Sequence, residues 1–407
     1  MSSIKSDIEQ IPVIDTHEHL RPEELYIEKP RDVFSLFRHY CSLDLVTSGM
    51  PQELCDAIFS DDRDVMWKWS QFEPYYENIQ LTGYCRAAHS CLKRFYGADH
   101  LTKDNIVPLS REVAAATQAG LYRKTLREAC NIECFISCDM GIEYPDSSAD
   151  KTLCRFVTPT LGYARWDGWD MTLTDLTPDG SCPSSIESLV SMADSWNTSH
   201  IKAGALGVKF NAFDTAAVDP AVAKAEFDLA KTNNSYKLKH NCALIRYLKL
   251  MELDHAVAAG YRVPVHTGYW CDFRELSAGA LIPFAESHPA AKIDMYHLGY
   301  PYVQEAICMG KRYANVWVNF VWLPVISPHC AEEVMDELLD TVPVNKLFAF
   351  GGDYSVPENV YGHLDIVRTI LANVLEKRVK RGEITPSGAL TVAEKLLYAN
   401  PKTFYGL

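Results

Sequence analysis

The sequence predicts an α/β fold, a (β/α)₈ barrel with a helical insertion after its first strand. The chain has 407 residues, and eight short apolar, β-branched segments alternate along it with helical segments. Such alternation is typical of parallel strands joined by crossover helices. Eight of these units form a barrel of about 250 residues, which accepts insertions. The expected strands are 12–15, 133–137, 156–161, 206–210, 262–266, 292–297, 316–320 and 347–351.

The segments between these strands carry apolar residues three and four positions apart, as a helix with one buried face requires. Residues 20–130 contain no convincing strand and are rich in aromatic residues. An insertion after the first strand would lie over the carboxyl ends of the strands, where barrel active sites are built. We therefore expect one domain, residues 1–407, with 20–130 as a helical lid within it. The other expected helices are 220–232, 244–259, 301–313, 329–339, 363–380 and 390–399.

The charge and composition of the chain limit the classes of partner that it can bind. The chain has 39 basic and 53 acidic residues, a formal charge of −14, which is the wrong sign for binding nucleic acid or an anionic membrane. There is no apolar run of membrane-spanning length and no apolar signal-peptide core, so we expect a cytoplasmic protein. Nucleotide-binding glycine motifs are missing as well. A small-molecule substrate is the expected partner, and a homo-oligomer is compatible with the sequence.

The most specific motif is a His-x-His at the end of the first expected strand, formed by His17 and His19. Alternate residues of a strand point to the same side, so both imidazoles can face one site. By the same alternation, Glu18 should point away from that site and have a structural role. Two convergent histidines are half of a metal cage, although the motif alone is a weak signal.

Three further residues follow other expected strands at their carboxyl ends. His266 ends the fifth strand, His297 ends the sixth, and Asp353 follows the eighth. In a closed barrel these ends meet around one mouth, so residues far apart in sequence can share one ion. Chance placement of all of them at strand ends is implausible, and we expect a metal site there.

This pattern resembles the amidohydrolase superfamily, whose metal-dependent barrels carry His-x-His on strand one, histidines on strands five and six, and aspartate on strand eight. The resemblance covers nearly the whole chain. The helical insertion is similar to that of uronate isomerases. The stretches most similar to the amidohydrolase-2 branch, which includes uronate isomerase-like barrels, are 207–210, 264–269, 297–301 and 350–354.

The resemblance implies that His17, His19, His266 and Asp353 bind a divalent metal ion, with Zn²⁺ and a single ion as the expectation. Neutral imidazoles and a carboxylate suit Zn²⁺, which lowers the pKa of a bound water toward about 7. The resemblance further implies that Asp353 takes the proton of that water. His297 would polarise a substrate carbonyl or hold the water.

Three more residues are candidates for substrate binding, each with an alternative. Lys209, on the fourth strand, resembles a lysine that is carbamylated and bridges two ions in some branches; it could instead be a substrate-facing ammonium or part of a structural ion pair. Arg165 matches the planar geometry of a carboxylate but could be a solvated loop residue. Tyr269 could line the pocket or pack on the barrel rim.

The leading hypothesis is a metal-dependent hydrolase in which metal-activated water attacks a carbonyl of an amide, lactone or related bond in a small, anionic substrate. The alternative is a lyase, such as a decarboxylase or hydratase, or a uronate-type isomerase using the same site. A catalytically inactive binding scaffold is a third hypothesis. The complete set of five strand-end residues argues against it, because polar groups are costly to bury without partners.

Overall fold

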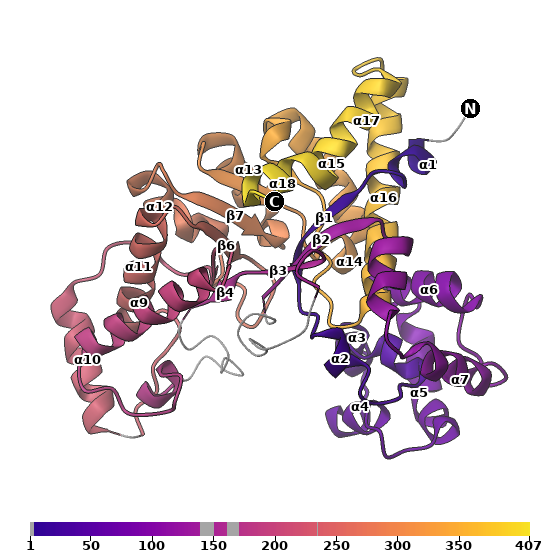
Figure 1. The fold of residues 1–407 in the computed structure, drawn as a ribbon, viewed down its shortest axis with the longest axis horizontal. Helices are drawn as coiled ribbons and strands as arrows, with labels where there is room; N and C mark the ends of the chain where they lie inside the picture. Colours follow the sequence, from indigo (N-terminus) through magenta and orange to yellow (C-terminus); the bar gives the residue numbers. More distant parts are fainter. Residues whose placement is uncertain (1–3, 139–149, 161–170, 234) are drawn as a thin grey trace.

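Parallel strands lie at the centre of the molecule, with helices around them (Figure 1). The computed structural model describes residues 4–138, 150–160, 171–233 and 235–407. All strand pairs are parallel, in sequence order. The strands are β1 (Val13–Glu18), β2 (Ile132–Ser137), β3 (Cys154–Phe156), β4 (Thr158–Pro159), β5 (Val208–Asn211), β6 (Arg262–His266), β7 (Lys292–Tyr296), β8 (Val316–Asn319) and β9 (Leu347–Phe348).

Two ladders, β1 to β3 and β4 to β9, join into one ring. β3 and β4 occupy a single strand position that is interrupted at Val157, whose N–H donates to Ser137 O of β2 (3.0 Å). At the other junction, Thr16 N–H donates to Phe350 O (3.3 Å) and Asp353 N–H to His17 O (2.8 Å). The ring therefore has eight strand positions, the order expected of an α/β barrel.

Several strand boundaries differ from the sequence-based expectation. β1 extends to Glu18, beyond the expected 12–15, and so includes the first histidine of the His-x-His. The expected strand 156–161 is split into β3 and β4, and Leu161 lies outside the described residues. In the expected strand 347–351, the ladder ends at Phe348, because the backbone then bonds to other partners: Ala349 N–H donates to Leu396 O (3.0 Å).

The chain between β1 and β2 is helical and lies to one side of the ring (Figure 1). Asp64 caps α5 by accepting hydrogen bonds from Met66 N–H and Trp67 N–H, and Thr82 caps α6 by accepting from Cys85 N–H. The helices are α2 (Glu23–Tyr26), η1 (Val33–Phe37), α3 (Cys41–Thr47), α4 (Gln52–Ile58), α5 (Val65–Ile79), α6 (Gly83–Tyr96), α7 (Ile106–Ala116) and η2 (Arg123–Ala129).

The remaining helices follow the strands around the ring or close the chain. The expected helix 220–232 coincides with α10, whereas the helix expected at 363–380 begins earlier, at Pro357. No helix of the described chain is long and apolar enough to cross a membrane. These helices are α1 (Ile4–Ile8), η4 (Leu173–Leu176), α9 (Ile186–Lys202), α10 (Pro220–Thr232), α11 (Ala243–Ala258), η5 (Ala278–Leu281), α12 (Ile282–Ser287), η6 (His297–Gly299), α13 (Val303–Arg312), α14 (Leu323–Ile326), α15 (Pro328–Thr341), η7 (Val344–Lys346), α16 (Pro357–Lys380), α17 (Pro386–Glu394), η8 (Lys395–Ala399) and α18 (Asn400–Tyr405).

The long helix α16 joins the barrel to the helical segment. It packs against α6 of that segment and against α15 and α1. At the α6 crossing, a Cβ on Gly362 would lie 2.0 Å from Ala87 O, so the two helices touch through their backbones. One hydrophobic core extends from barrel residues such as Val265 to Phe34 and Phe72 of the helical segment. The segment is thus packed onto the barrel through a shared core.

We expect Gly362→Ala to lower the free energy of unfolding by about 1–3 kcal/mol, because the added methyl group must push α16 away from α6. Gly388→Ala, in α17, is the matched control. Its Cβ would meet no backbone atom, only the Thr385 hydroxyl at 3.2 Å and Ile384 Cβ at 3.9 Å, and alanine favours a helix over glycine by up to about 1 kcal/mol. Urea unfolding followed by circular dichroism measures both. Equal losses in the two variants would contradict the backbone contact.

Candidate metal centre

Three side chains converge at the barrel mouth. His17 comes from β1, His19 directly follows it, and Asp353 lies in the loop between β9 and α16. The Asp353 Oδ1 atom lies 3.1 Å from His17 Nε2 and 3.3 Å from His19 Nε2. Each residue offers one ligand atom, and these atoms all lie within 4.8 Å of one another. This arrangement can hold a metal ion.

The ionisation states of Asp353 and His17 favour the binding of a cation. Burial opposes ionisation of Asp353, but its contacts with His17 and His19 hold the pKa of the carboxyl well below the ordinary value. Burial, and then the charge of Lys209, lower the pKa of His17 well below its ordinary value. A carboxylate and neutral imidazoles are the forms in which these residues bind metals. The donor set therefore fits a divalent ion.

His266 and His297 lie beside this group. Their rings are 4.2 Å apart, and the His297 ring is 5.9 Å from that of His17. Each Nε2 atom is buried without a hydrogen-bond partner among the described residues. His266 lies outside the tight three-residue group, but its orphaned nitrogen is available to a ligand at the mouth.

The tautomer of His297 follows from its backbone contact. Its Nδ1 lies 2.9 Å from Val321 O, which can only accept, so Nδ1 carries the proton and Nε2 presents a lone pair. Burial lowers the pKa of His297 to about 4, so the ring is neutral at pH 7. A neutral ring in this tautomer can accept a hydrogen bond at Nε2 but cannot donate one there.

Lys209 belongs to the same cluster. It is fully buried in β5, and its Nζ lies 3.0 Å from His17 Nε2 and 5.2 Å from the centre of the Tyr296 ring. Lys209 thus reaches the same nitrogen of His17 that Asp353 contacts.

Three residues of the mouth have a left-handed backbone. The φ angles are +58° at Asp353, +68° at His297 and +65° at Trp322. Side chains with a Cβ rarely adopt this region, and such strain persists only where the surrounding structure enforces it. Because three strained residues lie together at the mouth, the position of their side chains is indicated to matter for function.

Two buried carboxyl groups hold the loop that carries Asp353. Asp15 accepts a hydrogen bond from Gly352 N–H (3.0 Å), and Glu18 accepts one from Tyr354 N–H (2.8 Å). A Cβ on Gly352 would lie 1.9 Å from Glu18 Oε1, so only glycine permits this approach. Glu18 thus binds the backbone of this loop and is not one of the three converging residues.

This carboxyl pair holds a proton. Burial raises the pKa of Asp15 to about 6. Burial together with the charge of Asp15 raises the pKa of Glu18 well above its ordinary value, and the two side chains share a hydrogen bond. We therefore expect Glu18 to be the protonated member of the pair at pH 7.

Aromatic residues form one wall of the mouth. Trp322, after β8, stacks on Tyr40 of the helical segment with ring centres 4.8 Å apart, and Tyr40 stacks on Tyr84 at 4.9 Å. The Trp322 ring also lies 5.5 Å from that of His297 and 5.5 Å from that of Tyr269. Burial, followed by the charge of Asp353, raises the pKa of Tyr40 well above its ordinary value.

A family model described as Amidohydrolase (Amidohydro_2) matches residues 201–407. The chain belongs to this amidohydrolase family. The match covers Lys209, His266, His297 and Asp353, whereas His17 and His19 precede it. One curated protein, fluG of Emericella nidulans, is 26% identical over 121 residues, which are 30% of this chain and 14% of fluG. The amidohydrolase thus matches only a small part of that longer protein.

Solved structures match almost the entire amidohydrolase. A uronate isomerase from Thermotoga maritima has a TM-score of 0.79 at 14% identity, with 99% of this chain and 96% of that chain covered. A glucuronate isomerase from Caulobacter crescentus has a TM-score of 0.76 at 15% identity (99% and 93%). A Lactobacillus casei protein, whose assignment as a metal-dependent hydrolase is inferred, has a TM-score of 0.67 at 14% identity. The match covers 100% of this chain and 98% of that chain. At these identities the likeness shows a shared barrel fold.

The sequence identified some residues of the mouth and missed others. Tyr269 is partly exposed on the rim and contacts Trp322, and Arg165 lies outside the described residues. Tyr40 and Trp322 carried no motif that sets them apart from other aromatic residues. Asp15 did offer a signal, since a charged residue within an apolar strand must find a buried partner.

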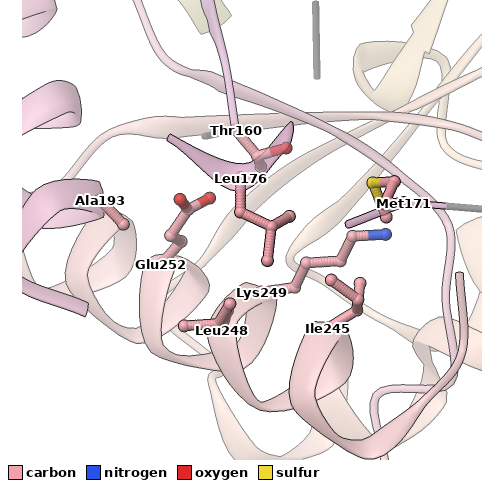
Figure 2. A pocket seen from close by; sticks show the side chains of 8 residues that line it. All are labelled: Thr160, Met171, Leu176, Ala193, Ile245, Leu248, Lys249 and Glu252. Carbon is pink, nitrogen blue, oxygen red and sulfur yellow. The ribbon is translucent and has the colours of Figure 1, made fainter. Parts of the chain in front are cut away.

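A separate small cavity of the amidohydrolase is lined mainly by apolar side chains and by Lys249 (Figure 2). Its volume is about 20 Å³, which is room for a water molecule and too little for a substrate. Lys249 Nζ lies 3.2 Å from His240 Nδ1, and burial lowers the pKa of Lys249 to about 7. None of the strand-end residues lines this cavity. The other lining residues are Thr160, Met171, Leu176, Ala193, Ile245, Leu248 and Glu252.

Glu18→Gln should change the free energy of unfolding by less than about 1 kcal/mol, because an amide can accept from Tyr354 N–H and donate to Asp15 as the protonated acid does. Glu18→Ala should cost about 2–4 kcal/mol, since it leaves buried polar groups unsatisfied. Urea unfolding measures both. A large loss in Glu18→Gln would show that Glu18 is ionised.

Burial of Lys249 should make the stability of the protein depend on pH. The folded state releases its proton near pH 7, whereas the unfolded lysine keeps it to about pH 10.4. The lysine's contribution to stability therefore rises with pH across this window, by at most about 1.4 kcal/mol per unit. The wild type should therefore become more stable relative to Lys249→Met, in unfolding free energy, as the pH rises from 7 to 9. The exposed Lys380→Met is the control, and a pH-independent difference for Lys249→Met would contradict the prediction.

Proposed function

We propose that this amidohydrolase is a metal-dependent hydrolase that attacks a carbonyl group of a small, anionic substrate, in an amide, lactone or related bond. The observation that carries the proposal is the convergence of His17, His19 and the ionised Asp353 on one point at the barrel mouth. The buried, unpartnered Nε2 atoms of His266 and His297 beside it support a site built for a ligand.

We propose that His17, His19 and Asp353 hold one divalent ion, Zn²⁺, with His266 as a further ligand. When bound, such an ion polarises a carbonyl group and makes a nearby water more acidic. Imidazole and carboxylate donors are the usual zinc ligands of catalytic sites.

Asp353 is the proposed general base. Its carboxyl group is ionised and can accept the proton of the attacking water, and its backbone N–H bond to His17 O holds it at the mouth. His297 is proposed to orient the water or a substrate hydroxyl by accepting a hydrogen bond at Nε2. The tautomer of His297 argues against its donating a hydrogen bond to a substrate carbonyl.

Substrate binding is proposed to involve the cation of Lys209 together with Tyr269 and Arg165. An ammonium in a buried site favours an anionic ligand. Residues 20–130 are proposed to act as a lid, supported by Tyr40 and Tyr84, which reach the mouth from this segment and stack in line with Trp322. The aromatic wall favours a substrate with an apolar face.

A uronate-type isomerase is the second candidate. The whole-chain likeness to uronate isomerases, which extends over the helical segment, favours it. In that reaction Asp353 would move a proton between neighbouring carbons of a sugar acid, and no water would be added. The same carboxylate and lysine serve either reaction, so the products must decide between them.

Product mass separates the candidates. The metal-loaded enzyme is incubated with libraries of lactones, amides, aromatic acids and uronates, and the products are analysed by mass spectrometry. Hydrolysis adds the mass of water, isomerisation leaves the mass unchanged, and decarboxylation removes carbon dioxide. Addition of water supports the proposal, and turnover without a change of mass would replace it with the isomerase.

Asp353→Asn should lower turnover by at least about 100-fold, because the variant lacks the base. Asparagine tolerates the left-handed backbone, so the loop should keep its place, and His17 and His19 should retain most of the metal. Elemental analysis and steady-state kinetics test both expectations. Asp272→Asn, on an exposed rim carboxylate paired with Arg274, is the control. Full activity in Asp353→Asn would exclude Asp353 as the base.

A further inference from the structure

A cavity of about 1020 Å³ lies in the helical segment, between α2, η1, α5, α7 and the start of α16. None of the described candidate metal ligands lines it, nor do Lys209 and His297. Seven of its 22 lining residues are basic and three are acidic. An excess of positive charge is unexpected in a chain with a net charge of −14.

Part of the basic wall is fixed by ion pairs. The Arg31 guanidinium contacts both carboxylate oxygens of Glu358, at 2.6 and 3.3 Å. Lys68 Nζ lies 2.6 Å from Asp32 Oδ2. The side chains of Lys68 and Arg31 are both largely shielded from solvent. These pairs neutralise two of the seven basic residues that line the cavity.

Other arginines at the cavity have no such partner. Arg21, Arg38 and Arg111 are exposed, come from three different parts of the helical segment, and form no ion pair among the described residues. Arg63 lies over the ring of Trp67, 5.0 Å from its centre. Four guanidinium groups thus line one cavity, and no carboxylate of the described residues lies within ion-pair distance of them.

We propose that this cavity binds a small polyanion, a molecule carrying two or more phosphate or carboxylate groups. Guanidinium groups present planar pairs of donors that match such oxygens. The volume is at the upper end of that of ordinary small-molecule sites. The net charge of −14 on the whole chain repels anions, so the local excess of cations favours a ligand that neutralises several of these charges together.

Isothermal titration calorimetry of the full-length protein with sodium pyrophosphate, and separately with citrate, tests the proposal. We expect binding of at least one of them at 20 mM NaCl and weaker binding at 200 mM NaCl, as salt screens charges. Binding of pyrophosphate alone identifies a phosphate site, and binding of citrate alone a carboxylate site. Failure of both anions to bind would overturn the proposal.

Variants locate the binding. Arg38→Ala and Arg111→Ala should each weaken binding by at least about tenfold, because each removes charged hydrogen bonds. Arg38→Lys should have an intermediate effect. The control is Arg123→Ala, which removes the same charge from an exposed pair with Glu128 outside the cavity. Anion binding at the candidate metal centre would persist unchanged in Arg38→Ala and Arg111→Ala, and that result would also overturn the proposal.

Discussion

A single backbone contact, the hydrogen bond from Asp353 N–H to His17 O, links the closure of the barrel to its candidate metal centre. At 2.8 Å it helps to join the first strand to the segment that follows the last one. The same bond brings the carboxylate of one residue against the imidazole of the other. A change that opens the barrel at this point would also separate the side chains of the candidate metal centre.

This closure depends on groups behind the mouth. Asp15 and Glu18 bind the backbone on either side of Asp353, and Gly352 allows them to approach. On the far side, His363 of α16 lies 2.9 Å from Gly352 O through its Nδ1. The loop is thus held by buried polar groups on both sides, which explains how it keeps an unfavourable left-handed φ angle at Asp353.

The helical segment contributes two different surfaces. One reaches the mouth, where Tyr40 stacks on Trp322. The other surrounds a basic cavity whose walls include Ser355 and Val356, which directly follow the loop of Asp353. The helix α16 begins beside this cavity and bonds to the loop through His363, so both surfaces are attached to one rigid element. Charge distinguishes the two surfaces: the mouth centres on a carboxylate, whereas the cavity is lined by arginines.

The sequence by itself determined the α/β class, the order of the strands and the convergence of His17, His19 and Asp353. These features follow from local rules: alternation places His17 and His19 on the same side, and the carboxyl ends of parallel strands meet at one edge. The break at Val157 and the early end of β9 were not predictable, because they depend on which backbone groups neighbouring segments offer.

Only the tertiary structure decided the protonation and the surroundings of the site. Glu18 looks like an ordinary acid in the sequence, and its pKa is raised because folding buries it beside Asp15. Tyr40 joins the mouth because η1 and α3 pack on the barrel, and Arg38, two positions earlier, faces the basic cavity. The contact of Tyr40 with Trp322 joins residues hundreds of positions apart, so its energy depends on packing that no local pattern records.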